Sequence, residues 1–173
     1  MMTKSPASGP EGNRANSDVR LEPASPENRK AILALELAED QVDQLATNHE
    51  SLAEAKRDRN ARPRAILAGD RVVGFLMYDA SEQEEALLYR FMIDHREQGR
   101  GYGRAALNAL VREVEALGSV EALVVCYMPD NEPARRLYLN FGFAEEGEDE
   151  DGEVQARLPL PRNELSPALR TLS

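Results

Sequence analysis

Cysteine, histidine and tryptophan are nearly missing from this sequence of 173 residues, which has one cysteine, two histidines and no tryptophan. The lone cysteine, Cys126, excludes an internal disulfide and agrees with a reducing compartment. Two isolated histidines make a poor set of ligands, so we expect no metal site. No apolar run approaches the ~18 to 20 residues of a membrane span, and the first residues contain no apolar signal segment. We therefore expect a cytoplasmic protein without a membrane partner.

Positive charge is also scarce, since 21 Lys and Arg residues stand against 31 Asp and Glu residues, a formal net charge of −10. This balance argues against a nucleic-acid partner, because basic surfaces bind phosphate backbones. A high net charge of either sign favours solubility. Arginine is nevertheless concentrated in one segment, where we expect a local positive region: Arg90, Arg96, Arg100 and Arg104.

The length predicts one domain that is large enough to bury a core. Residues 1–17 are rich in Ser, Pro, Gly and Asn, so we expect a disordered tail there, a domain over 18–161 and a C-terminal tail over 162–173. Helical periodicity predicts one helix from about Pro26, a second over about 41–59 and a third from Gly101 toward Gly118. Apolar runs and hairpin signals predict strands at 19–21, 64–68, 71–78, 86–93, 122–127 and 154–160.

Three glycines at alternate positions, Gly99, Gly101 and Gly103, lie between a predicted strand and the third helix. Strand, glycine turn, helix and strand together predict a βαβ unit with parallel strands, whose ligands bind at the carboxyl ends of the strands. The free N–H groups of a helix N-terminus attract anions. No Lys-Ser or Lys-Thr follows the glycines, which argues against a nucleotide-hydrolysing loop. The turn therefore predicts a site for a phosphate or pyrophosphate.

Two motifs carry a resemblance to a known family. The segment QGRGYG at residues 98–103 fits the Q/R-x-x-G-x-G/A signature of the GNAT superfamily of N-acetyltransferases, and NEPARRLYLNFGF at 131–143 is similar to that family's second block. The element order from Val19 to Leu160 resembles the whole family domain, over about 140 residues. The segments LYRFMID at 88–94 and EPASPENR at 22–29 look most like bacterial spermine/spermidine acetyltransferases.

The resemblance implies an α/β (α+β) fold with a mixed central sheet flanked by helices, acetyl-CoA as co-substrate, and a homodimer. It implies that backbone groups of Phe91, Met92 and Ile93 pair with the pantetheine arm, and that Asn131 contacts the cofactor. Tyr138 would protonate the departing CoA thiolate. The pyrophosphate would lie on the backbone N–H groups of Gln98, Gly99, Arg100, Gly101, Tyr102, Gly103 and Arg104.

The resemblance implies that the acceptor is a small-molecule primary amine, and the polyamine acetyltransferases point to a polyamine. A protein N-terminus and an aminoglycoside remain alternative acceptors. A non-catalytic module that binds acetyl-CoA as a sensor remains an alternative function. An alkylamine with a pKa of ~10.4 must lose a proton before it attacks. Many relatives have a carboxylate where this chain has Tyr89, so Glu85, Asp79 or an ordered water stay open as the base. The acidic run 145–153 is expected to be a solvated loop, or alternatively to attract a cationic acceptor.

Overall fold

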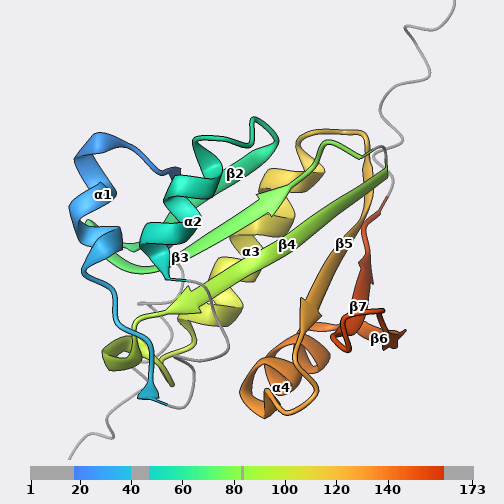
Figure 1. The fold of residues 1–173 in the computed structure, drawn as a ribbon. Coiled ribbons are helices and arrows are strands. Elements are labelled where there is room, and N and C mark those ends of the chain that lie inside the picture. Colours follow the sequence, from blue (N-terminus) through green and yellow to red (C-terminus); the bar gives the residue numbers. More distant parts are fainter. Residues whose placement is uncertain (1–17, 40–46, 83, 162–173) are drawn as a thin grey trace, which may run out of the picture.

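Seven strands form one mixed sheet in the order β1-β2-β3-β4-β5-β7-β6 (Figure 1). The computed structural model describes residues 18–39, 47–82 and 84–161. Only the β4–β5 pair is parallel among the strand pairs of these residues. The strands are β1 (Val19–Pro23), β2 (Ala61–Ala68), β3 (Arg71–Asp79), β4 (Glu84–Ile93), β5 (Val120–Tyr127), β6 (Ala144–Glu148) and β7 (Val154–Pro159).

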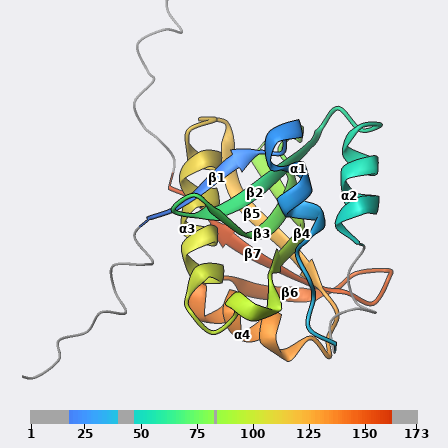
Figure 2. The same cartoon turned by 90° about the vertical axis from the view of Figure 1, so that its left-hand side faces the viewer.

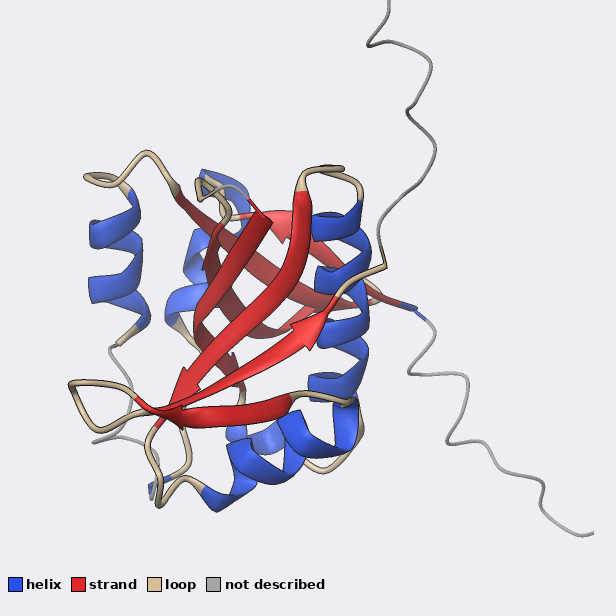
Figure 3. Cartoon of the chain, turned by 90° about the vertical axis from the view of Figure 1, so that its right-hand side faces the viewer, coloured by secondary structure: helices blue, strands red, loops and turns tan. Residues whose placement is uncertain are grey.

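Helices cover both faces of the sheet, as Figures 2 and 3 show from opposite sides. The helices are α1 (Pro26–Leu33), α2 (Asn48–Ala55), α3 (Tyr102–Glu115) and α4 (Glu132–Phe141). Side chains of α3 and α4 pack in one hydrophobic cluster, and those of α1 and α2 pack in a second one with other residues of the sheet. The expected mixed sheet flanked by helices is confirmed, and no described helix has the length and apolar character needed to cross a bilayer.

Helix α3 shows how the sequence builds the first cluster. Leu107, Leu110 and Val114 are all 0 % exposed and follow one another at spacings of three and four residues, so they lie on one helix face. That face packs across the sheet, in one cluster with Val19 of β1, Leu88 of β4 and Leu123 of β5. The predicted βαβ unit is confirmed, with β4 and β5 parallel from Glu84 opposite Val120 to Leu88 opposite Val125.

Beyond Leu88 the two parallel strands separate, and Figure 1 shows β4 and β5 diverging toward their carboxyl ends. The later residues of β4 pair only with β3, whereas the end of β5 pairs with β7. The register shifts at Tyr89, where Met77 lies opposite Arg90 but Tyr78 lies opposite Leu88. A bulge of this kind bends a strand and increases its twist. The sheet is therefore opened in its middle, next to the glycine turn.

Two predictions of secondary structure need correction. The predicted second helix ends earlier, because α2 stops at Ala55 and β2 begins at Ala61; its expected start near residue 41 lies outside the described residues. The acidic run is only partly a loop, since its first residues form the edge strand β6 against β7. Arginines from neighbouring elements neutralise this strand: Arg135 contacts Glu145 and Arg157 contacts Glu146, each at 2.7 Å.

Candidate functional site

A cavity of about 420 Å³ lies where β4 and β5 separate. Its walls come from the second half of β4, the glycine turn, the end of β5, the start of α4 and the residue before β7. This is the carboxyl end of a parallel pair, where α/β sheets bind ligands. Nearly every residue that the motifs predicted lines it: Phe91, Met92, Ile93, Gln98, Gly99, Gly101, Tyr102, Gly103, Arg104, Asn131 and Tyr138.

The glycine turn forms one wall through its backbone. Gly99 and Gly101 have φ values of +73° and +83°, in the left-handed region that favours glycine. Gly101 is the N-cap of α3, so the first N–H groups of that helix have no partner within it. Alternating left- and right-handed residues turn successive N–H groups toward one point and form an anion-binding nest. The left-handed glycines of this turn are compatible with the predicted anion site.

Three of the four arginines of the predicted positive region are in ion pairs, and the fourth, Arg104, contacts only uncharged groups. Arg100 is not among the residues that line the cavity, and Arg104 donates to the Asn140 carbonyl at 3.0 Å while stacking on Phe141. Arg104 lines the cavity and has no carboxylate partner among the described residues, so its positive charge adds to that of the backbone N–H groups at the turn. The ion pairs are Arg90–Glu54 (3.3 Å), Arg96–Asp94 (2.9 Å) and Arg100–Glu97 (3.2 Å).

The end of β4 forms the second wall. Past the bulge, Phe91, Met92 and Ile93 have a strand neighbour on the β3 side only. The Ile93 carbonyl oxygen accepts a hydrogen bond from the side-chain amide of Gln98 at 3.1 Å, so a polar group already engages this edge. The other edge groups face the cavity, where an extended amide-containing chain can pair with them as an added strand does.

Helix α4 forms the third wall and carries Tyr138. Asn131 is its N-cap, and the Asn131 side-chain oxygen accepts from the Ala134 N–H at 3.2 Å. Tyr138 is only 5 % exposed, and its hydroxyl has no hydrogen-bond partner among the described residues. Burial raises the pKa of Tyr138 well above its ordinary value, with smaller contributions from Tyr127 and Cys126. The hydroxyl therefore stays protonated at neutral pH and can donate that proton.

The two carboxylates considered as the base lie elsewhere. Glu85 contacts Arg157 at 2.6 Å, and the Asp79 carboxylate accepts from the Ser81 N–H at 2.7 Å. Neither residue lines the cavity, whereas Glu153, which the sequence did not single out, does. The only signal for it was the expectation that the acidic run could attract a cation. Which acid of that run reaches the cavity depends on the register of the β6–β7 hairpin.

Tyr89 lies on the cavity wall at the bulge of β4. Its hydroxyl is buried and has no hydrogen-bond partner among the described residues. Burial, followed by the charges of Glu54, Asp58 and Asp79, raises the pKa of Tyr89 to about 12. The Arg90 guanidinium lies 5.4 Å from the centre of the Tyr89 ring and opposes the effect of these carboxylates.

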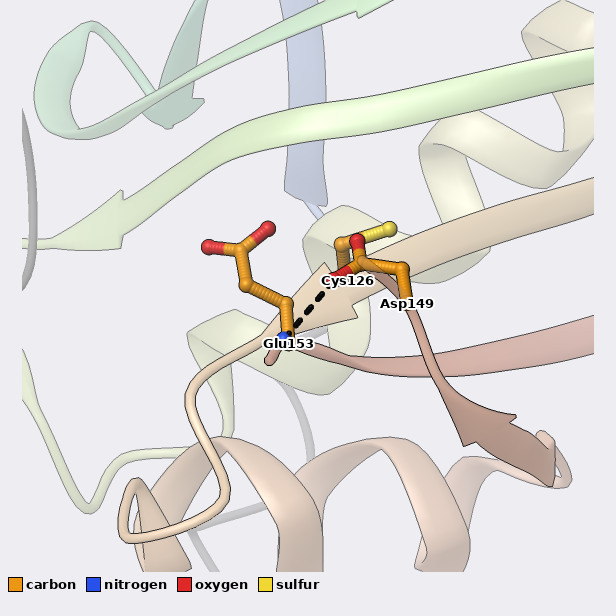
Figure 4. Close-up of side chains that lie close together, drawn as sticks. All are labelled: Cys126, Asp149 and Glu153. Carbon is orange, nitrogen blue, oxygen red and sulfur yellow. Dashed lines mark hydrogen bonds between the residues drawn. The ribbon is translucent and has the colours of Figure 1, made fainter. Parts of the chain in front are cut away.

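Cys126, Asp149 and Glu153 come together at the end of β5 (Figure 4), with one ligand-type atom of each within 4.8 Å of the others. Cys126 is half-buried and lines the cavity. Burial and the two neighbouring carboxylates raise the pKa of its thiol, which therefore keeps its proton at neutral pH. A protonated thiol beside two carboxylates is a poor nucleophile.

Comparisons with known proteins agree with this geometry. A model of the acetyltransferase (GNAT) family matches residues 29–143. The chain is 30% identical over 143 residues to spermine/spermidine N(1)-acetyltransferase of Bacillus subtilis (strain 168), covering 78% of this chain and 94% of that protein. Among solved structures, it resembles spermidine N-acetyltransferase from Vibrio cholerae in complex with CoA and spermine, with a TM-score of 0.69 and 14% identity over 84% of this chain and 98% of that one.

A further structural match is the ribosomal-protein-S18-alanine N-acetyltransferase from Escherichia coli, with a TM-score of 0.63 and 21% identity over 90% of this chain and 99% of that one. Its named acceptor is a protein, whereas that of the Bacillus protein is a polyamine. At these identities the solved structures share the fold with this chain. The fold alone does not decide between the two kinds of acceptor.

Proposed function

We propose, since this chain belongs to the acetyltransferase (GNAT) family, that it acetylates a primary amine of a polyamine. Proteins of this family use acetyl-CoA, and the chain is an acetyl-CoA-dependent N-acetyltransferase. The curated relatives that act on spermine or spermidine support the choice of acceptor, because they match over 78% of this chain. A homodimer, a cytoplasmic location and the absence of a nucleic-acid or membrane partner stay predictions.

The cofactor fits the cavity through backbone groups. In our proposal the N–H groups of the turn from Gln98 to Arg104 hold the pyrophosphate, and Arg100 contributes only from outside the cavity. The free edge of β4 at Phe91, Met92 and Ile93 pairs with the pantetheine arm, and Asn131 contacts the cofactor from the start of α4. The left-handed glycines of the turn support this proposal, since they orient consecutive N–H groups toward one anion.

Tyr138 is proposed as the proton donor to the CoA sulfur. The observation that carries this assignment is that its hydroxyl is protonated and has no hydrogen-bond partner among the described residues, on a buried side chain that lines the same cavity. A hydroxyl without a partner in the protein can donate its hydrogen bond to a ligand. A reacting sulfur that accepts this hydrogen bond would be stabilised at the moment of transfer.

The polyamine is supported by the acidic character of the chain, which has a formal net charge of −10. The carboxylates of Asp58 and Asp79 act on Tyr89 in the cavity wall, whereas the carboxylate of Glu54 is paired with Arg90. Surfaces of one sign concentrate ligands of the other sign and accelerate their association. A linear chain of ammonium groups suits this environment better than a neutral or anionic acceptor does.

An acceptor panel tests the proposed substrate class. The protein is incubated with acetyl-CoA and, separately, spermidine, spermine, a peptide with a free N-terminus, and an aminoglycoside, while the release of free thiol is followed. We expect the highest kcat/KM with spermidine or spermine, and a mass increase of one acetyl group on that amine. A higher kcat/KM with the peptide or the aminoglycoside would overturn the polyamine assignment and keep the acetyltransferase.

A further inference from the structure

The acetyl-transfer reaction needs a group that accepts the proton of the incoming ammonium, because an alkylamine is almost fully protonated at neutral pH. Two carboxylates line the cavity in the described part of the chain, Glu97 and Glu153. Glu97 already pairs with Arg71 and with Arg100. Its negative charge is therefore compensated by two guanidinium groups.

Glu153 differs because its carboxylate makes no hydrogen bond or ion pair with any other described residue. It lies directly before β7 and is half-buried, with one face toward the cavity. Taking a carboxylate partly out of water without a partner is unfavourable. A bound cation would supply the missing partner.

The hairpin between β6 and β7 places Glu153 rigidly. One carboxylate oxygen of Asp149 accepts the N–H groups of Asp151 at 3.0 Å and Glu153 at 2.9 Å, and the second of these bonds is the dashed line in Figure 4. The Asp149 N–H donates in return to the Glu153 carbonyl at 2.9 Å. Asp149 is thus engaged in shaping the turn, whereas the Glu153 side chain is left available.

Glu153 also lies near the reacting end of the cavity. Its carboxylate oxygen is within 4.8 Å of the Cys126 sulfur, and Cys126 and Tyr138 line the same cavity as Glu153. Tyr138 is 5 % exposed, lines the same cavity, and has a hydroxyl without a partner among the described residues. A proton donor and an uncompensated carboxylate therefore share one space, an arrangement that acid–base catalysis requires.

We infer that Glu153 binds the ammonium group of the acceptor in this cavity and takes its proton, an inference that rests on the proposed acetyl transfer. The acceptor enters as R–NH₃⁺, and one proton passes to the Glu153 carboxylate. The nitrogen then bonds to the acetyl carbon, and the carbon–sulfur bond breaks as the sulfur receives a proton from Tyr138.

The remaining protons balance without a further reactant. The nitrogen loses a second proton as the amide forms, and water carries that proton to the Tyr138 oxygen. Glu153 releases the first proton to solvent when the product leaves. In the overall reaction, R–NH₃⁺ and the thioester give the acetamide, the free thiol and one proton. The Glu153 carboxylate is ionised again at the end of each turnover.

The test compares Glu153→Gln with Glu150→Gln, which removes the same charge from the exposed part of the same hairpin. With spermidine and acetyl-CoA we expect kcat at pH 7 to fall about 100-fold or more in Glu153→Gln, the lower end of the effect of a general base. We expect it to stay unchanged in Glu150→Gln. An unchanged Kd for CoA in both variants shows that the cavity is folded.

The pH profile separates proton transfer from simple attraction. Without the carboxylate, the reaction depends on amine that is already neutral in solution, so kcat/KM of Glu153→Gln should rise about tenfold per pH unit below the amine pKa of ~10.4. The wild type should rise less steeply. Parallel profiles, or equal kcat in the two variants, would overturn the inference and leave the proposed function standing.

The same comparison is made with whichever amine of the acceptor panel the wild type acetylates. A wrong acceptor class therefore overturns the polyamine proposal while the role of Glu153 is still measured. A wild type that acetylates none of the amines would overturn the proposed function and, with it, this inference.

Discussion

Tyr127 and Tyr138 lie side by side with ring centroids 5.4 Å apart, but their hydroxyls are in different states. The Tyr127 hydroxyl donates to the Glu145 carboxylate at 2.8 Å, whereas the Tyr138 hydroxyl has no partner among the described residues. The first is therefore occupied in holding β6 against the end of β5. The second is the one that can donate to a reacting sulfur.

The hydrogen-bond partners of Asp94 decide how this buried carboxylate contributes to the stability of the protein. It is 3% exposed, and its carboxylate accepts from the Arg96 guanidinium at 2.9 Å and from the Glu36 N–H at 3.0 Å. The Arg96 hydrogen bonds hold the pKa of Asp94 well below its ordinary value. The ionised Asp94 carboxylate therefore stabilises the folded protein at pH values above about 4, the ordinary pKa of an aspartate. This contribution to the free energy of unfolding is lost as the pH falls below that value and the carboxylate becomes protonated.

We expect Asp94→Asn to lower the free energy of unfolding by about 1–3 kcal/mol at pH 7, because an amide cannot replace a carboxylate that accepts several N–H groups. Urea unfolding at pH 7 and at lower pH measures this, with the exposed Asp70→Asn as control. The difference between the wild type and Asp94→Asn should shrink in acid. A difference that is absent at pH 7 would contradict this role.

At the level of elements, the glycine turn joins β4 to α3 and supplies the anion site. Gly99 in this turn and Gly118 after α3 both have φ of +73°, and a Cβ at either position would meet no other atom within 4 Å. Only Gly99 lines the cavity. The two glycines therefore have the same φ value and the same open space, but only Gly99 lies at the cavity, so Gly118 serves as its control.

We expect Gly99→Ala and Gly118→Ala each to destabilise the protein by about 1 kcal/mol, the cost of a left-handed conformation for an L side chain. Only Gly99→Ala should weaken CoA binding, by about tenfold, which corresponds to one hydrogen bond to the phosphates. Titration calorimetry with CoA and urea unfolding measure the two effects. Equal CoA affinity in both variants would contradict the pyrophosphate assignment.

The sequence was sufficient to predict the helices and strands whose hydrophobic periodicity is strong. Leu107, Leu110 and Val114 predicted the buried face of α3, and the strand on either side of it predicted the parallel pair. Strand β6 could not be predicted, because glutamates disfavour an edge strand until Arg135 and Arg157 neutralise them. Those arginines lie in α4 and β7, so their effect depends on tertiary contacts.

For the molecule as a whole, the site exists because the sheet divides. Strand β5 leaves β4 after Leu88 and continues against β7, and the cavity occupies the opening. The motifs predicted the residues of the turn and Tyr138, since these belong to contiguous segments with a family pattern. Glu153 could not be predicted, because its place on the cavity results from the β5–β7 register and the bonds of Asp149.

The proposed acid and base come from two consecutive parts of the chain, helix α4 and the β6–β7 hairpin. Tyr138 comes from α4 on one face, and Glu153 comes from the hairpin that pairs with β5. Their roles in the account are complementary, since one supplies a proton to sulfur and the other removes one from nitrogen. The proposed acetyl transfer in this cavity depends on the Tyr138 hydroxyl.

The most direct measurement is the rate of thiol release from acetyl-CoA with spermidine for Tyr138→Phe and for Tyr127→Phe. We predict that kcat falls about 100-fold or more in Tyr138→Phe with an unchanged Kd for CoA, the effect of removing a general acid. Tyr127→Phe should keep most of its kcat. Equal kcat values in the two variants would contradict the role of Tyr138, and a wild type that binds acetyl-CoA but acetylates no amine would contradict catalysis itself.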